Sequence, residues 1–351
     1  MAFSSDPHTY QRTRLWRLVS LAVPLLLSTT LSAQNPSFVS FDAPDAGKNA
    51  DQGTFATSIS QTGAIAGWYI DAGGAIHGFF RLTNGQITEF DAPGGLNTVS
   101  NAINRHGQIV GTYGLAHSNH TRGFLHNVNR GFTRVDVAGA TDTIPHAIDD
   151  SGNIAGAYDD SAGAWHGFLR ASSATYTLFD APGAGSGQSQ GTTPVAMNAN
   201  GQITGYYVDA NDQRHGFIRD ALGNVTTFDA AGTGTQPTWI NLSGLVTGYY
   251  ADSEALGHSF LRDSAGNITT IDMPRAAQTF ASGLNDQGTV VGEIVPPPPT
   301  AFAGFERSSS GDYLRLMPPG ANSADAISIN NQGRITEYYV DLSEVAHGFV
   351  K

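Results

Sequence analysis

Five histidines recur at one position of a repeated sequence pattern, and they are the residues best suited to acid-base or metal chemistry. They are His77, His166, His215, His258 and His347. An aspartate lies fourteen residues after each of the first four, as Asp91, Asp180, Asp229 and Asp272. An imidazole beside a carboxylate can act as a base, bind a metal or form a structural pair. The behaviour of the partners distinguishes these roles.

The cation and the aspartate are kept or lost together. The same spacing joins Arg122 to Asp136, whereas Ala303 and Met317 replace both members of another pair. For His347, the only carboxylate at the corresponding position is Asp42, near the other end of the chain. A cation that is present only with its carboxylate is typical of a structural pair. We therefore predict that these pairs stabilise neighbouring strands, and we assign no catalytic residue.

A second aspartate precedes the histidine by six residues in five repeats. It occurs as Asp71, Asp160, Asp209, Asp252 and Asp341. The repeat with Arg122 lacks this aspartate but keeps Asp136. We expect the later aspartate to be the more constant partner.

The elements that must position these pairs are repeated as well. A turn glycine recurs as Gly63, Gly107, Gly152, Gly201, Gly244, Gly288 and Gly333, which is 270 residues in six steps averaging 45. Asparagine, aspartate or serine stands three residues before each glycine, as a hairpin turn requires. Repeats of roughly 40 to 50 residues are typical of β-propeller blades.

Each repeat contains alternating segments that predict four antiparallel strands. The third segment carries a phenylalanine in every repeat: Phe79, Phe124, Phe168, Phe217, Phe260, Phe305 and Phe349. A four-stranded sheet cannot bury both faces alone, so neighbouring sheets must stack. We predict an all-β fold, a seven-bladed β-propeller spanning residues 34–351.

The chain ends suggest how the ring closes. The last repeat stops at Lys351 after its third strand, and residues 38–44 form a lone strand before the first repeat. Its motif, Phe41-Asp42-Ala43-Pro44, matches the fourth strand of other repeats. We predict that this N-terminal strand completes the seventh blade, with an open array as the alternative.

The repeated segments resemble a known family of repeats. Residues 102–104, residues 107–111 and His215-Gly216-Phe217 are similar to the bacterial extracellular HAF repeat, and the resemblance covers residues 38–351. The His-Ala-Phe of that repeat is replaced by His-Gly-Phe in four repeats and by His258-Ser259-Phe260 in one. The resemblance implies export and repetition, and it transfers no active site.

The N-terminus has the features of a secretory signal peptide, which we place at residues 1–33. Three arginines precede an apolar run at residues 18–27, and Ala33 offers a small residue for cleavage. A membrane span needs roughly twenty apolar residues, so this run predicts export to an extracellular or periplasmic location without membrane insertion. An uncleaved anchor remains the alternative.

Composition limits the partners and cofactors. Beyond residue 33 the chain carries 15 basic and 29 acidic side chains, a formal charge of −14, which argues against nucleic acid. The chain has no cysteine, so disulfides and thiolate metal sites are excluded. We predict no metal site and no cofactor, although Asp209, Asn211 and Gln213 leave a weak case for calcium.

The residue type varies between repeats at one position of the innermost strand. It provides the candidate binding residues Asn101, His146, Thr238 and Ser282, and Asp325 lies nearby. We predict a secreted binding or scaffold propeller that presents its loop-rich face to an extracellular polysaccharide, cell-surface or protein ligand. The alternative is a propeller hydrolase of glycosides, esters or lactones. A glycosidase would need a second carboxylate about 5–10 Å from Asp325.

Overall fold

All regular secondary structure in the described part of the chain is β-strand. The computed structural model describes residues 37–116, 118–128, 130–297 and 301–351, which contain 29 strands and no α-helix. No helix in these ranges is therefore long and apolar enough to cross a membrane. The all-β prediction is confirmed. The predicted signal peptide lies outside the described residues.

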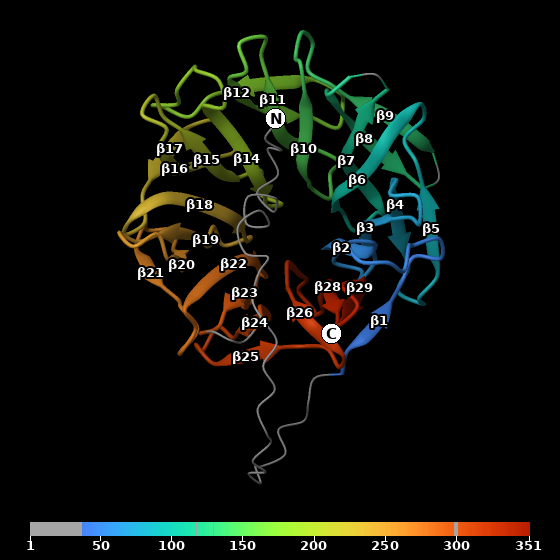
Figure 1. Cartoon of the computed structure of the whole chain (residues 1–351). Coiled ribbons are helices and arrows are strands. Elements are labelled where there is room, and N and C mark those ends of the chain that lie inside the picture. The colour runs from blue at the N-terminus through green and yellow to red at the C-terminus, as the bar shows by residue number, and fades with distance from the viewer. Residues whose placement is uncertain (1–36, 117, 129, 298–300) are drawn as a thin grey trace. The chain divides into compact units, whose positions relative to one another are not determined.

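Antiparallel strands form groups that follow one another along the chain (Figure 1). Group one contains β2 (Gly53–Ile59), β3 (Ile65–Ile70), β4 (Ile76–Arg81) and β5 (Ile87–Phe90). Group two contains β6 (Gly95–Ile103), β7 (Gln108–Leu115), β8 (Thr121–Asn127) and β9 (Gly131–Val135). Group three contains β10 (Thr143–Ile148), β11 (Ile154–Asp159), β12 (Trp165–Arg170) and β13 (Tyr176–Phe179). Group four contains β14 (Gly191–Met197), β15 (Ile203–Val208), β16 (Arg214–Arg219) and β17 (Val225–Phe228).

The remaining strands repeat this order. Group five contains β18 (Thr233–Ile240), β19 (Val246–Ala251), β20 (Gly257–Arg262) and β21 (Ile268–Thr270). Group six contains β22 (Gln278–Leu284), β23 (Val290–Val295), β24 (Ala303–Arg307) and β25 (Tyr313–Leu316). Group seven contains β26 (Ala321–Ala324), β27 (Ser328–Ile329), β28 (Ile335–Asp341) and β29 (Ala346–Val350), and β1 (Val39–Phe41) pairs with β29.

Three groups are separate four-stranded sheets, and parallel bridges join the other groups in pairs. A single pair, Trp165 with Gly191, links groups three and four into an eight-stranded sheet. The pair Gly53 with Ala346 links groups one and seven into a nine-stranded sheet. In Figure 1 the groups surround a common centre, with the first strand of each group nearest to it.

The two ends of the described chain meet in group seven. Phe41 of β1 lies opposite Gly348 of β29, as Phe90 of β5 lies opposite Gly78 of β4. The ring of Phe38 packs edge-to-face on Phe349, with 5.6 Å between centroids. Strand β1 therefore occupies in group seven the position that β5 occupies in group one.

Repeated turns and side-chain bonds explain why the sequence folds in this way. In group five, Asn241 Oδ1 accepts hydrogen bonds from the amides of Ser243 and Leu245, and Gly244 takes a φ of 79°. The side-chain Nδ2 of Asn241 donates to the backbone carbonyl of Asn285 in group six, over 3.1 Å. Bonds of this kind connect the inner hairpins of neighbouring groups.

The core lies between the sheets and is built from the repeated phenylalanines. All seven are at most 1% exposed. In six of the seven groups the neighbouring strand leaves room for the ring by using glycine: a Cβ on Gly67 would lie 2.6 Å from the Phe79 ring and 2.3 Å from the carbonyl oxygen of Phe55. Close packing of one ring on one glycine is therefore the unit from which the core is repeated.

Candidate functional site

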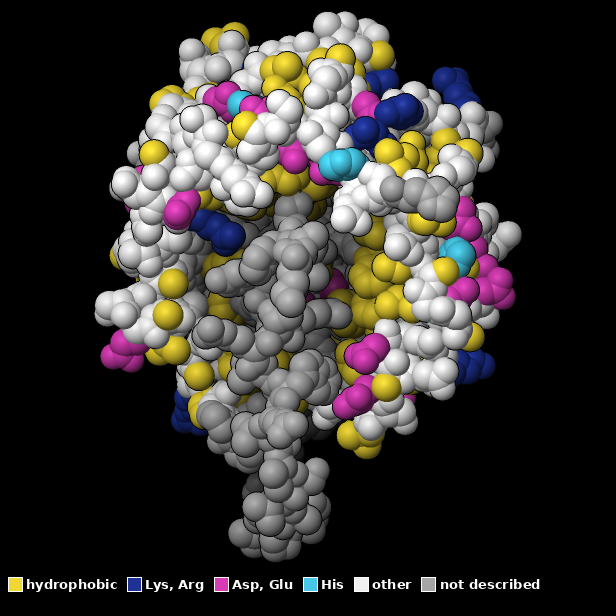
Figure 2. Space-filling view, turned by 45° about the horizontal axis from the view of Figure 1, so that its top comes forward, with side chains coloured by type: hydrophobic (Ala, Val, Ile, Leu, Met, Phe, Trp, Pro, Cys, Tyr) yellow, Lys and Arg dark blue, Asp and Glu magenta, His cyan; other side chains and the backbone are white. Residues whose placement is uncertain are grey.

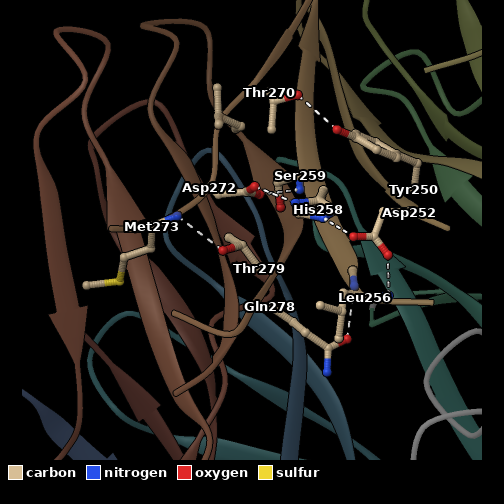
Figure 3. Close-up of polar contacts among 12 residues, drawn as sticks. Tyr250, Asp252, Leu256, His258, Ser259, Thr270, Asp272, Met273, Gln278 and Thr279 are labelled. Carbon is tan, nitrogen blue, oxygen red and sulfur yellow. Dashed lines mark hydrogen bonds and ion pairs between the residues drawn. The ribbon is translucent and has the colours of Figure 1, made fainter. Parts of the chain in front are cut away.

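The best-defined polar cluster lies in group five, at the edge where β19 turns into β20. His258 Nδ1 lies 2.5 Å from Asp272, and its Nε2 lies 3.2 Å from Asp252 (Figure 3). The ring of Tyr250 stacks on the imidazole with 5.4 Å between centroids, and its hydroxyl lies 2.9 Å from Thr270 Oγ1. Every polar atom at the centre of this cluster has a partner.

The same arrangement recurs at the other four histidines. The Nδ1 atom lies 2.8–3.0 Å from the strand-four aspartate in the pairs His77–Asp91, His166–Asp180, His215–Asp229 and His347–Asp42. The Nε2 atom lies 3.5–3.6 Å from the turn aspartate in the pairs His77–Asp71, His166–Asp160, His215–Asp209 and His347–Asp341. The structure thus brings together all the histidine pairs predicted from the sequence. Figure 2 shows acidic side chains beside histidines on the face drawn.

Charge interactions in the group-five cluster shift both partners toward their charged forms. The hydrogen bond that His258 donates to Asp272 raises the pKa of His258 above its ordinary value, although partial burial opposes this. The amide of Leu256 lowers the pKa of Asp252, and the His258 side chain adds to this. An imidazole that donates from both nitrogens must be protonated. This geometry stabilises an ion pair and leaves no ring nitrogen to act as a general base.

Two side chains around His258 also have structural contacts. The amide of Ser259 donates to Asp272 (Figure 3). The Ser259 hydroxyl accepts the amide of Ala281 over 2.8 Å. Ser259 is fully buried. Thr279 Oγ1 accepts the amide of Met273 at 3.1 Å. Neither hydroxyl is placed as a nucleophile.

Groups two and six, which lack the repeated histidine, agree with the sequence pattern. In group two, Arg122 Nε lies 3.6 Å from Asp136, and Arg134 also contacts that carboxylate. In group six, Ala303 and Leu316 fill the core beside Met317. No group of three or more histidine and acidic residues with metal-binding geometry occurs within the described ranges.

In group one an open cavity of about 430 Å³ lies beside the repeated histidine cluster. Tyr69, His77, Asp71 and Asp91 line it, as members of the repeated cluster. The remaining lining consists of Phe90 and two further carboxylates, Asp45 and Glu89. Sequence analysis did not single out these two residues, although both differ in type from their counterparts in the other repeats.

The candidate binding residues of the inner strand lie at a repeated irregularity. The strand register shifts at Asn101, His146, Thr238 and Ser282, so each of these half-buried residues is a β-bulge. Asn101 Nδ2 donates to the carbonyl of Pro145 at 2.8 Å, and Thr238 Oγ1 donates to the carbonyl of Ala281 at 3.0 Å. These bonds connect neighbouring inner strands. Ligand binding by these residues stays a prediction.

Asp325 lies where the inner strand of group seven is interrupted, between β26 and β27. Its amide donates to the carbonyl of Tyr338 at 3.2 Å, next to Glu337. Glu337 is fully buried and stands where six other groups have glycine, which is a sequence signal that we did not use.

Comparison with solved structures identifies the fold. No protein-family model matches the sequence, and no curated protein matches it. A catalytically inactive virginiamycin B lyase from Staphylococcus aureus with quinupristin is 13% identical with a TM-score of 0.58, over 90% of this chain and 99% of the other. The β-propeller domain of the Trilobed protease from Pyrococcus furiosus is 8% identical with a TM-score of 0.60, over 85% and 95%. A lectin from Burkholderia pseudomallei is 11% identical with a TM-score of 0.55, over 84% and 93%. These likenesses show a β-propeller fold and do not transfer an activity.

Proposed function

We propose that residues 34–351 form a closed seven-bladed β-propeller that is exported and acts as a binding or scaffold module. In this proposal the seven strand groups are the blades, and β1 completes the seventh blade. The ligand contacts the edge that carries the strand 2–3 turns and the strand 4–1 loops. The protein performs no catalysis.

Two contacts between distant parts of the sequence support the closed ring. Asn330 Nδ2 donates to the carbonyl of Ser60 at 3.1 Å, which continues the asparagine bonds from the last group to the first. His347 pairs with Asp42 across 305 positions, with the geometry that other groups achieve across fourteen. Both contacts follow directly if the first and last blades are neighbours.

The observation that carries the binding proposal is that all five repeated histidines lie between two aspartates, with Nδ1 at 2.5–3.0 Å from one and Nε2 at 3.2–3.6 Å from the other. A histidine held between two carboxylates stabilises an edge but does not abstract a proton. Function is therefore more reasonably sought in the residues that differ between groups, and those lie in the loops and bulges. The variety of proteins that share the fold agrees with function added to a common scaffold.

A binding screen with matched activity assays tests this proposal. The mature chain, residues 34–351, is screened against a glycan array and secreted proteins, and in parallel against glycoside, ester and lactone substrates. We expect binding without turnover, and weaker binding when residues 184–190 of the strand 4–1 loop are shortened. The variant His215→Ala serves as the control, because it should lower stability and leave ligand binding intact. Reproducible turnover by the purified protein would contradict the proposal.

A further inference from the structure

The cavity of group one lies on the same loop-bearing edge but differs in chemistry from the equivalent places in other groups. The position of Glu89 on strand four is occupied by Thr270 in group five and by Leu178 in group three. The position of Asp45 in the preceding loop is occupied by Gly232 before group five. A Cβ on Gly232 would lie 2.7 Å from the Tyr250 ring, so that place is already filled.

The loop that carries Asp45 is fixed by backbone contacts. The amide of Gly47 donates to the carbonyl of Ile70 at 2.8 Å, and Ala46 pairs with Asp71. The amide of Asp45 donates to Glu89 Oε1 at 2.9 Å. These contacts place both additional carboxylates beside the repeated histidine cluster, and they use one oxygen of Glu89.

Tyr69 provides an independent observation at this cavity. It is 4% exposed, it lines the cavity, and its ring stacks on His77 with 5.0 Å between centroids. Its hydroxyl makes no hydrogen bond to any residue that the structure describes. In group five the equivalent hydroxyl, on Tyr250, is satisfied by Thr270 at 2.9 Å. The hydroxyl is therefore available to accept a hydrogen bond from a ligand in the cavity that Tyr69 lines.

The cavity is strongly acidic. Asp45, Asp71, Glu89 and Asp91 surround a single imidazole. The amide of Ala75 lowers the pKa of Asp71, with further contributions from Gly73 and His77, so this carboxylate stays ionised at neutral pH. Burial, followed by the carboxylates of Glu89 and Asp45, raises the pKa of Tyr69, so the phenol stays neutral. A positively charged ligand would offset the repulsion among these groups.

We infer that this cavity binds a primary ammonium group, carried by an amino sugar or by a lysine side chain. This inference rests on the proposed binding function and names the ligand class for one place on the loop-bearing edge. An ammonium group has three N–H donors, which match the carboxylates of Asp45 and Glu89 and the hydroxyl oxygen of Tyr69. The rings of Tyr69 and Phe90 offer apolar surface to the attached carbons.

A bare metal ion fits this cavity less well than an organic cation. A metal needs several ligand atoms at about 2–2.6 Å from one point. The acidic residues of the described part do not form such a cluster. An ammonium group accepts longer N–H to oxygen distances of about 2.7–2.9 Å, and a cavity of about 430 Å³ has room for the rest of the ligand.

Two pairs of probes test the inference and distinguish the two sources. Glucosamine is compared with N-acetylglucosamine, and Nα-acetyl-lysine methylamide is compared with Nα-acetyl-norleucine methylamide, by saturation-transfer NMR and calorimetry at pH 7 and low salt. The double variant Asp45→Asn with Glu89→Gln removes the two additional charges. The double variant Glu254→Gln with Glu344→Gln removes two charges from turns of other groups and serves as the matched control. Tyr69→Phe is paired with Tyr250→Phe, and thermal unfolding establishes that every variant is folded.

We expect at least one amine to bind about tenfold more tightly than its amine-free counterpart, and the Asp45 and Glu89 variant to lose about tenfold in affinity. The amine that binds identifies the source. Tyr69→Phe should weaken binding by about threefold, while Tyr250→Phe and the Glu254 and Glu344 variant should not. Equal binding of amine and amine-free probes, or full affinity in the Asp45 and Glu89 variant, would overturn the inference. Either result is compatible with the proposed function if the glycan or protein screen finds a partner. Catalytic turnover would contradict the proposed function but not the ammonium site.

Discussion

Groups one and five contain the same polar cluster, but the residues around it differ. The shared members are a stacked tyrosine, a histidine and two aspartates: Tyr69, His77, Asp71 and Asp91 in group one, and Tyr250, His258, Asp252 and Asp272 in group five. In group five, Thr270 and Gly232 close the cluster with a small hydroxyl and a bare backbone. In group one, Glu89 and Asp45 leave a cavity.

This difference distinguishes the residues that stabilise the fold from the residues that we propose bind the ligand. The histidine and its aspartates recur because they join strand four and the turn to strand three in the five groups that carry them. The positions of Glu89 and Asp45 vary because the sheet forms without them. Variants of the shared members should therefore affect stability in both groups alike, and variants of the differing members should affect ligand binding in group one alone.

The largest effect is expected from deleting residues 38–44. The deletion removes β1 from β29 and takes Asp42 from His347. It also removes Phe41, whose ring lies 6.1 Å from Phe79 and under the guanidinium of Arg81. We expect a loss of at least about 4 kcal/mol in the free energy of unfolding and association through the exposed edge.

Thermal unfolding, size-exclusion chromatography and hydrogen exchange measure this effect. Hydrogen exchange should rise more in groups one and seven than in group five, because only the first two contact β1. An unchanged melting temperature with monomeric elution would contradict ring closure by this strand.

Truncation of the buried phenylalanine should lower the free energy of unfolding equally in groups one and five. Phe79 and Phe260 are each fully buried. Phe79→Ala and Phe260→Ala should each lower the free energy of unfolding by about 3–5 kcal/mol. Chemical denaturation measures both values. A cost in group one that is far below that in group five would show that the two cores are not equivalent.

A smaller effect is expected from the group-five histidine. The pKa of His258 is raised above 6.5, so its ion pairs contribute fully below pH 6.5, and the contribution is lost as the pH rises through the folded-state pKa. The pKa of Asp252 is lowered, so its contribution is present above pH 3.8 and is lost at lower pH, as the pH falls through the folded-state pKa.

His258→Gln should therefore remove about 1 kcal/mol near pH 5.5 and less at pH 8. Denaturation of the variant and the unsubstituted protein across this range gives the difference directly. A cost that grows with pH would contradict the ion-pair account.

The smallest effect is expected from removal of the tyrosine hydroxyl. The change in the free energy of unfolding should differ between group five and group one. Tyr250→Phe removes the hydrogen bond to Thr270 and should cost about 1 kcal/mol. Tyr69→Phe removes a hydroxyl of the cavity lining that has no partner in the described part of the chain, so it should be close to neutral. Differential scanning calorimetry resolves the two variants. Equal losses would show that the Tyr69 hydroxyl is satisfied in the folded protein.

The sequence was sufficient to predict the all-β class, the repeat and the histidine pairs, because each depends on residues that recur at fixed spacing. The bulges at Asn101 and Thr238 could not be predicted, since a register shift depends on the neighbouring strand and not on residue type alone. Buried Thr279, which caps the amide of Met273, was missed because threonine is common in any strand. The cavity beside Glu89 and Asp45 could not be predicted because it depends on how the loop that carries Asp45 approaches strand β5 in three dimensions.

The central claim is that the residues shared by the groups stabilise the propeller, whereas the residues that differ between groups bind the ligand. The most direct test measures thermal midpoint and affinity for the binding amine together, in His258→Ala and in the Asp45→Asn, Glu89→Gln variant. We expect His258→Ala to lower the midpoint and keep the affinity within about twofold, because the two groups are separate sites. We expect the Asp45 and Glu89 variant to keep or raise the midpoint and to lose about tenfold in affinity. The reverse pattern, with affinity lost in His258→Ala and kept in the other variant, would contradict the claim.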